Sequence, residues 1–125
     1  MFSQRSVYAT IPASDVSRAQ RLYEEKLGFT PRAIEPSGTM YDAGGGTGFL
    51  IYPTPNAGQA PNTLMSFSSQ DVGADVTALR ARGVVFEEYD FPGLKTVQGV
   101  AKLGNIEAAW FKDSEGNILG ISTGS

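Results

Sequence analysis

Acid–base or nucleophilic chemistry in this chain has to proceed without histidine and cysteine, because its 125 residues contain neither. Histidine is the usual metal ligand and the usual general base near neutral pH, and cysteine supplies thiolate ligands and nucleophiles. Carboxylates and phenols are the groups left for proton transfer. Glu107 begins a strand expected to border a pocket, although an exposed strand-end residue is the alternative. Glu87, Glu88 and Asp90 fit a solvated strand edge better than a paired acid–base site.

The glycine-rich run Asp42-Ala-Gly-Gly-Gly-Thr-Gly48 has the composition of a phosphate-binding loop. It lacks the Gly-Lys-Ser/Thr ending of such loops, and the sequence after it does not predict a helix. We therefore interpret the run as the connection of a β-hairpin.

Aromatic residues offer a different kind of site. Tyr41, Phe49, Tyr52 and Trp110 would suit a cage around a planar or cationic ligand, because aromatic faces stack on rings and attract cations. The alternative is that several of them belong to the core or to an interface. The segment 89–96 carries two aromatic residues, a lysine and a Pro-Gly turn, so it is either a semi-rigid lip over a pocket or a plain connection.

Length and composition indicate one globular domain, with 41% hydrophobic and 18% charged residues. The sequence has no apolar run of membrane-spanning length, and its start lacks the apolar region of a signal peptide. We expect a cytoplasmic protein without a membrane partner. A net charge of -3 with no cluster of Lys and Arg argues against nucleic-acid binding.

The first half of the chain predicts one helix and four strands. Side chains over residues 6–12 alternate between two sets, Val7, Ala9 and Ile11 on one face and Tyr8 and Thr10 on the other, which predicts a strand. A helix follows from the cap residue Asp15 to about Leu27, and Gly28 stops it. Further strands are predicted at 29–35, 39–43 and 47–52, before a linker rich in proline and glycine and poor in anchoring residues.

The second half repeats this pattern. A strand at 64–70 precedes a helix that opens at Asp71 and closes at Gly83, and the two caps and the two glycines are almost equally far apart along the chain. The polar turn 113–117 predicts a closing hairpin, since Gly116 tolerates positive φ. The strands expected after the helix are at about 84–88, 98–104, 107–112 and 117–122.

These elements predict an α+β fold of two βαβββ modules within one domain, 1–125. Module one spans about 1–53, a linker about 54–62 and module two about 63–125. Each module forms a curved mixed sheet under one helix, and alternation directs Val7, Ala9 and Ile11 toward the first helix. The opposite sheet faces would enclose a small-molecule site. They are expected to carry Tyr8, Thr10, Leu64, Ser66, Ser68, Ile118, Gly120 and Ser122, with Trp110 as a further member.

The duplicated layout, the segment Asp15 to Phe29 and the run Trp110-Phe-Lys-Asp-Ser-Glu-Gly-Asn117 resemble the vicinal oxygen chelate superfamily. That group includes glyoxalase I, extradiol dioxygenases, fosfomycin-resistance transferases and bleomycin-resistance proteins. The resemblance covers nearly the whole chain. It implies the glyoxalase/bleomycin resistance fold and, for a chain of this size, a homodimer.

The same resemblance implies where a divalent metal would be held. Enzymes of the superfamily use His, Glu or Gln on the first and last strands of each module, and the matching positions here are Tyr8, Leu64, Gly120 and either Leu50 or Ile51. These residues supply neither carboxylate nor imidazole, and a lone phenol does not make a divalent site. We therefore expect no metal and no other cofactor.

Three hypotheses for function follow. The leading one is a metal-independent, non-catalytic protein that sequesters or carries a small aromatic or hydrophobic molecule, as the bleomycin-resistance resemblance implies. The second is a metal-free isomerase, epimerase or lyase acting on a carbonyl compound, with Tyr8 or Glu107 transferring the proton. The third is a structural or regulatory dimer whose cavity is filled by side chains. The ligand-binding residues expected under the first are Tyr8, Thr10, Tyr52, Leu64, Ser66, Trp110 and Gly120.

Overall fold

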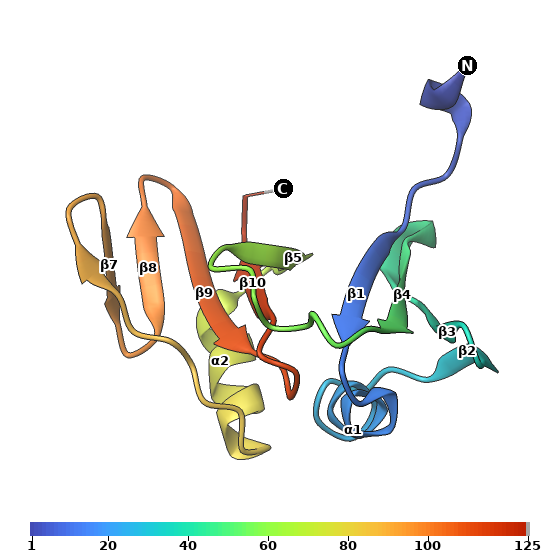
Figure 1. Cartoon of the computed structure of the whole chain (residues 1–125). Coiled ribbons are helices and arrows are strands. Elements are labelled where there is room, and N and C mark those ends of the chain that lie inside the picture. The colour runs from blue at the N-terminus through green and yellow to red at the C-terminus, as the bar shows by residue number, and fades with distance from the viewer. Residues whose placement is uncertain (125) are drawn as a thin grey trace.

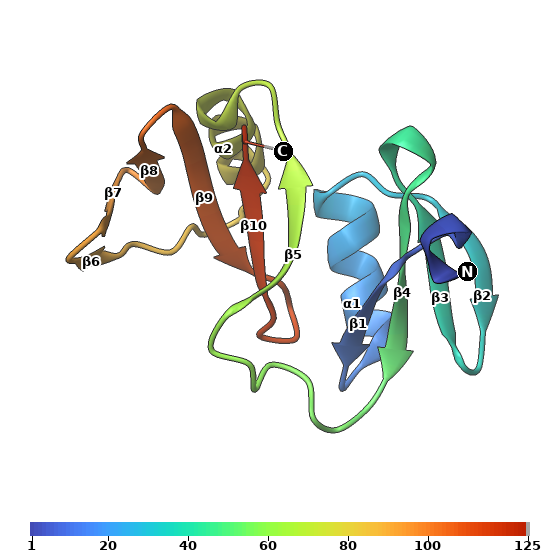
Figure 2. The same ribbon diagram turned by 90° about the horizontal axis from the view of Figure 1, so that it is seen from above.

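The computed structural model describes residues 1–124 and arranges them as two modules side by side, each a β-sheet with a helix on one face (Figure 1). Seen from above, the sheets lie in front of both helices, so the sheet faces turned away from the helices are open (Figure 2). Strands β1 (Ala9–Ala13) and β5 (Thr63–Ser68) lie at the facing edges of the two sheets and contact each other. No helix in this described range is both long and apolar enough to cross a membrane.

Module one has the predicted order of elements. Helix α1 (Val16–Arg21) begins at Asp15, which caps it by accepting a hydrogen bond from the Arg18 amide, and it continues as the π-helical turn η2 (Leu22–Lys26). Gly28 then takes a φ of 84°, which favours glycine after a helix. The strand order is β1-β4-β3-β2, with β1 parallel to β4. The other strands are β2 (Pro31–Glu35), β3 (Gly38–Asp42) and β4 (Gly48–Pro53).

The glycine-rich run connects two antiparallel strands. It forms a short turn, η3 (Gly44–Gly46), between β3 and β4, and the Ala43 amide donates to the Thr47 carbonyl across it. The prediction of a hairpin connection is confirmed.

Module two repeats the arrangement with a longer sheet, ordered β5-β10-β9-β8-β7-β6. Helix α2 (Val72–Ala81) begins at the cap Asp71, and Gly83 follows it with a φ of 90°. Strand β5 pairs in parallel with β10, as β1 does with β4. The strands after the helix are β6 (Asp90–Phe91), β7 (Leu94–Val97), β8 (Val100–Leu103), β9 (Ile106–Lys112) and β10 (Ile118–Ser122).

Two predictions for the stretch 84–96 are wrong. Residues 84–88 do not form a strand, and they join β9 only through a bridge between Phe86 and Phe111 and a hydrogen bond from the Glu87 amide to the Trp110 carbonyl. The segment 89–96, predicted as a loop, contains the short hairpin of β6 and β7, which turns at Pro92-Gly93 as its composition suggested.

The core lies between each sheet and its helix. In module one, the predicted helix stripe buries Ala19 and Tyr23 against Ile11 and Ile51. In module two the buried residues are Val72, Val76, Ala109, Phe111, Leu119 and Ile121. This core also takes two members of the expected aromatic cage.

Tyr41 and Phe49 are these two residues. They are 0% and 1% exposed, and their rings pack against Tyr23 and Phe29 with centroid separations of 5.0 to 6.4 Å. Both lie on the helix side of the first sheet, so the alternative interpretation, a core role, is correct for them.

The N-terminal arm projects from the body of module one (Figure 1). It begins with the 3-10 turn η1 (Phe2–Gln4), and β1 pairs with β4 only from Ala9 onward. Val7 was expected to face the helix but is 85% exposed, because it precedes the first pair of the ladder.

The turn of the last hairpin joins the modules through buried polar groups. Asp113 accepts a hydrogen bond from the Tyr23 hydroxyl at 2.8 Å, and the Asn117 amide group donates to the Pro12 carbonyl at 2.8 Å. Asn117 also accepts from the Gly58 amide at 3.2 Å. The linker is therefore anchored on this turn, although the sequence had suggested that it lacked anchors.

Glu115 makes the densest of these contacts, with a side chain that is 0% exposed. It accepts hydrogen bonds from the Asp15 amide at 2.9 Å and from the Arg18 guanidinium at 2.8 and 3.0 Å, and from the hydroxyls of Ser14 and Ser114. Burial favours a neutral carboxyl, but these donors outweigh it and lower the pKa of Glu115 to about 2. A charged carboxylate thus holds the two modules together.

Candidate functional site

Strand register brings three of the predicted site residues together on the open face of module two. Gly120 lies opposite Trp110 on β9 and opposite Ser66 on β5. A Cβ atom at Gly120 would lie 2.7 Å from Ser66 Oγ and 3.5 Å from Trp110 Cδ1. Glycine therefore lets the serine hydroxyl and the indole approach each other over the β10 backbone.

The hairpin of β6 and β7 extends this surface with aromatic rings. The Tyr89 ring lies 5.6 Å from the Trp110 ring at 64°, an edge-to-face contact, and Phe91 lies 5.8 Å from Tyr89 and is 53% exposed. Two hydrogen bonds hold Tyr89, since its amide donates to Thr96 Oγ1 and its carbonyl accepts from the Thr96 amide. Burial, with a smaller contribution from Glu87, raises the pKa of Tyr89, so its hydroxyl stays neutral.

Tyr89 was not among the predicted site residues. The sequence signal that could have identified it is the alternation Tyr89-Asp-Phe91 before the Pro-Gly turn, which places both rings on one side of a hairpin. The contact with Trp110 was not readable, because it depends on the segment before Tyr89 running beside β9, where Phe86 bridges Phe111 and the Glu87 amide donates to the Trp110 carbonyl.

The open face of module one carries Thr10 and Tyr52. Thr10 pairs with Leu50, and the next residue pair along β1 and β4 toward this face is Pro12 with Tyr52. Thr10 is exposed and Tyr52 is half-buried. Leu50 therefore faces the site, whereas Ile51 is fully buried on the helix side.

A cleft of about 590 Å³ lies between the facing edges of the two sheets. Tyr8 lines it from the arm and Ser66 and Ser68 line it from β5, so the cleft brings two predicted site residues from different modules together. Its other walls are formed by Val7, Ala9, Ala43, Gly44, Thr47, Gly48, Phe49, Met65 and Phe67. Tyr8 is 53% exposed.

Two candidates lie apart from this surface. Leu64 packs partly against the core, next to a register shift between β5 and β10. Glu107 pairs with Lys102 and lies two residues before the buried Ala109, so the two side chains share a face of β9. Glu107 therefore lies on the helix side of the sheet, beside Lys95 and Val97. Glu107 borders a separate cavity of about 480 Å³ on that side, so it does not share a site with Tyr8.

The residues at the superfamily's metal positions do not fit a metal ion. With Leu50 identified as the fourth, the set is Tyr8, Leu50, Leu64 and Gly120, which offers one phenol and no carboxylate, imidazole or amide side chain. Within residues 1–124, no three His, Cys, Asp or Glu side chains are grouped so that they could hold a metal.

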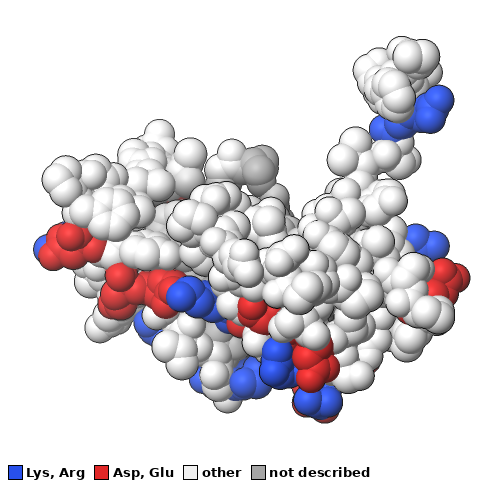
Figure 3. Space-filling model, viewed as in Figure 1, with Lys and Arg blue, Asp and Glu red and all other residues white. Residues whose placement is uncertain are grey.

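Charge is distributed unevenly over the molecule. In Figure 3 most of the basic and acidic side chains lie in the middle and lower parts of the view, a further basic patch lies on the projecting arm, and the upper surface between the modules carries none. The open faces therefore offer stacking, apolar contact and hydroxyl groups in place of ion pairs.

The fold has many solved counterparts. UcmS2 superposes with a TM-score of 0.76 at 19% identity, covering 95% of this chain and 97% of that one. TnmS3, an antibiotic binding protein from Streptomyces sp. CB03234, gives 0.67 at 24% identity, with 97% and 96% covered. Lactoylglutathione lyase from Agrobacterium tumefaciens gives 0.71 at 15% identity, with 97% and 94% covered. No curated protein sequence matches significantly.

These structural identities are low, and by themselves they establish only a shared fold. The sequence itself carries the family assignment, since the profile of one family matches residues 5–120, nearly the whole chain. Together with two βαβββ-like modules and their mixed sheets, this match shows that the chain belongs to the glyoxalase/bleomycin resistance protein/dioxygenase superfamily.

Proposed function

We propose that this protein binds a small, largely uncharged aromatic or hydrophobic molecule on the open faces of its sheets, without a metal, and sequesters or carries it. The observation that carries the proposal is the surface made by Trp110, Gly120 and Ser66 with the Tyr89 and Phe91 rings beside it. Half-exposed aromatic rings next to a glycine provide a flat apolar platform.

The polar groups at this surface suit orientation of a ligand better than chemistry on it. Ser66, Thr10 and Tyr8 bring hydroxyl groups to the open faces or to the cleft beside them. Hydroxyls donate and accept single hydrogen bonds without demanding a charged partner. TnmS3, an antibiotic binding protein with the same fold, gives a precedent for a binding role.

A homodimer is part of the proposal. Apart from the rings assigned to the ligand, the projecting arm presents Phe2 and Val7 at 70% and 85% exposure. A second copy would cover such apolar surface. Light scattering after size-exclusion chromatography is expected to give twice the 13.3 kDa chain mass, and a single-chain mass would contradict this part.

The binding role is testable with the neutral dye N-phenyl-1-naphthylamine, whose fluorescence rises in apolar sites. Trp110 is the chain's one tryptophan, so quenching of its emission shows that the dye binds within energy-transfer range of it. Trp110→Ala is expected to weaken dye binding about tenfold, since it removes a stacking partner and its buried area. Trp110→Phe keeps an aromatic face and is the matched control.

The stability of the Trp110→Ala variant must be measured in parallel with its dye binding. Because Trp110 is only partly buried, Trp110→Ala is expected to change the urea midpoint little. Unchanged dye affinity in this variant would refute the assignment of Trp110 to the site. Absence of any dye binding or ligand-induced rise in Tm would favour the filled-cavity dimer instead.

A further inference from the structure

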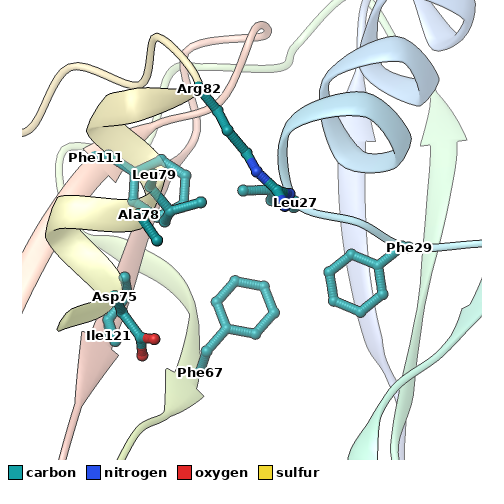
Figure 4. A pocket seen from close by; sticks show the side chains of 9 residues that line it. All are labelled: Leu27, Phe29, Phe67, Asp75, Ala78, Leu79, Arg82, Phe111 and Ile121. Carbon is teal, nitrogen blue, oxygen red and sulfur yellow. The ribbon is translucent and has the colours of Figure 1, made fainter. Parts of the chain in front are cut away.

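A second cavity lies on the helix side of the molecule, away from the open faces. It has a volume of about 270 Å³ and opens between α2 and the end of the first helix (Figure 4). Leu27 and Phe29 line it from module one, and Phe67, Leu79 and Phe111 line it from module two. Most of its wall is therefore apolar and aromatic, and both modules contribute.

The volume limits what this cavity accepts. An apolar cavity of about 150 Å³ is enough to bind benzene, and sites for drug-sized molecules begin near 300 Å³. The space here thus suits a single aromatic ring with a short side chain. Phe29 and Phe67, whose ring centroids are 5.9 Å apart, offer edges and faces for such a ring.

Asp75 gives the cavity a negative end. Its carboxylate points into the space beside the Phe67 ring (Figure 4), and the Ser69 hydroxyl fixes its orientation by donating to Oδ2 at 2.6 Å. None of the salt bridges found among residues 1–124 involves Asp75.

Arg82 is the cationic residue that lines this cavity, and it lies at the end next to the first helix. Its guanidinium donates to the Lys26 carbonyl at 3.1 Å, at the end of the first helix, where a cation offsets the helix dipole. Figure 4 shows its side chain reaching across to Leu27, so that it forms a roof over one end of the cavity. The guanidinium keeps its positive charge at the Leu27 end, whereas the Asp75 carboxylate lies at the other end, beside Phe67, so an ammonium group would be bound at the Asp75 end.

We propose that this cavity is a second binding site, which takes a single-ring aromatic molecule bearing a protonated amine. The ring would lie among Phe29, Phe67 and Leu79, and the ammonium group would bind the Asp75 carboxylate. The walls provide affinity through apolar burial, and the carboxylate provides selectivity for a cation over a neutral or anionic analogue. The net charge of -3 acts in the same direction.

Three probes of similar size and different charge test this assignment: 2-phenylethylamine, 2-phenylethanol and 3-phenylpropionate. Titration followed by ¹H–¹⁵N correlation spectra is expected to shift the amide signals of residues 27–29 and 75–82. The amine should bind most tightly, the alcohol less tightly and the carboxylate least. Shifts confined to the open faces, or equal affinity for amine and carboxylate, would overturn the proposal.

Two variants test the charge of Asp75 and the free volume of the cavity separately. Asp75→Asn keeps an acceptor for Ser69 and is expected to weaken amine binding about tenfold, the loss of one charge-assisted hydrogen bond, while alcohol binding stays the same. Ala78→Phe fills the cavity from the exposed surface of α2 and should abolish binding of both. Asp90→Asn, on the distant β6 hairpin, is the matched charge control. Phe67 is left intact because it also lines the cleft between the sheets.

Failure of this inference is distinguishable from failure of the proposed function. Trp110→Ala should leave amine binding at the helix side unchanged, and Ala78→Phe should leave dye binding at the open faces unchanged. If Asp75→Asn binds the amine as the unmodified protein does, or if Trp110→Ala abolishes amine binding, the second site is refuted.

Discussion

Replacement of Glu115 by glutamine removes the charge that joins the two modules and keeps the shape of the side chain. The carboxylate is fully buried and receives hydrogen bonds from Arg18, Ser14, Ser114 and the Asp15 amide. Glutamine retains one oxygen acceptor but presents an NH₂ group to the remaining donors. We expect Glu115→Gln to fold, because a domain of this size has about 5–15 kcal/mol of stability.

The size of the effect follows from the pKa of Glu115. Burial alone would raise this pKa, yet the hydrogen bonds lower it from 4.5 to about 2. A pKa lowered in the folded state stabilises the protein above pH 4.5, here by about 3 kcal/mol, and this contribution disappears as the pH falls toward 2. At pH 3 roughly 2 kcal/mol of it has already been lost.

Urea unfolding between pH 7 and pH 3 measures this contribution. The difference in unfolding free energy between the unmodified protein and Glu115→Gln should be about 3 kcal/mol at pH 7 and about 1 kcal/mol at pH 3. Glu25→Gln, at an exposed carboxylate of the first helix, is the control and should track the unmodified protein. If Glu115→Gln loses stability in parallel with the unmodified protein over this range, the stabilising role of the Glu115 charge between the two modules (the charged joint) is refuted.

Two further substitutions test the same joint by urea unfolding. Tyr23→Phe removes the hydroxyl that donates to Asp113 and should cost about 1 to 2 kcal/mol, since Asp113 keeps its backbone donors; no loss would show that this bond is dispensable. Gly58→Ala places a Cβ against the Glu115 carbonyl at a φ of 76° and should cost about 2 to 4 kcal/mol. Gly104→Ala has a similar positive φ with open space around it and should cost only about 1 kcal/mol, so equal losses would exclude the steric argument.

The local structure of this joint was predictable and its role was not. Turn chemistry at 113–117 correctly predicted the hairpin of β9 and β10, because Asp, Ser and Gly act on their own backbone. The partners that Glu115 has in module one, namely Ser14, Asp15 and Arg18, are about 100 residues away in the sequence. No local pattern reports such a distance, so the buried acidic turn looked like an ordinary exposed one.

The open face was predicted where strand alternation alone decides it. Because successive side chains of a strand point to opposite faces, Ser66 and Gly120 lie on the side away from the core. The pairing of β9 with β10 places Trp110 on the same side. Alternation does not say which side of a strand the helix covers, and the side on which Glu107 lies became readable only from the register of β8 and β9. Tyr41 and Phe49 show the same limit, since their ring chemistry suits a cage but their register places them under α1.

The joint also decides whether a ligand uses one sheet or both. Polar contacts of Glu115 fix module two against the start of α1, and they hold the open faces of the two sheets in one relative orientation. A ligand that touches Thr10 and Tyr52 as well as Trp110 depends on this orientation, because a preorganised site avoids the entropy cost of ordering. Dye affinity of Glu115→Gln at pH 7, where the variant is still folded, should then fall severalfold. Unchanged affinity would confine the ligand to the surface of module two.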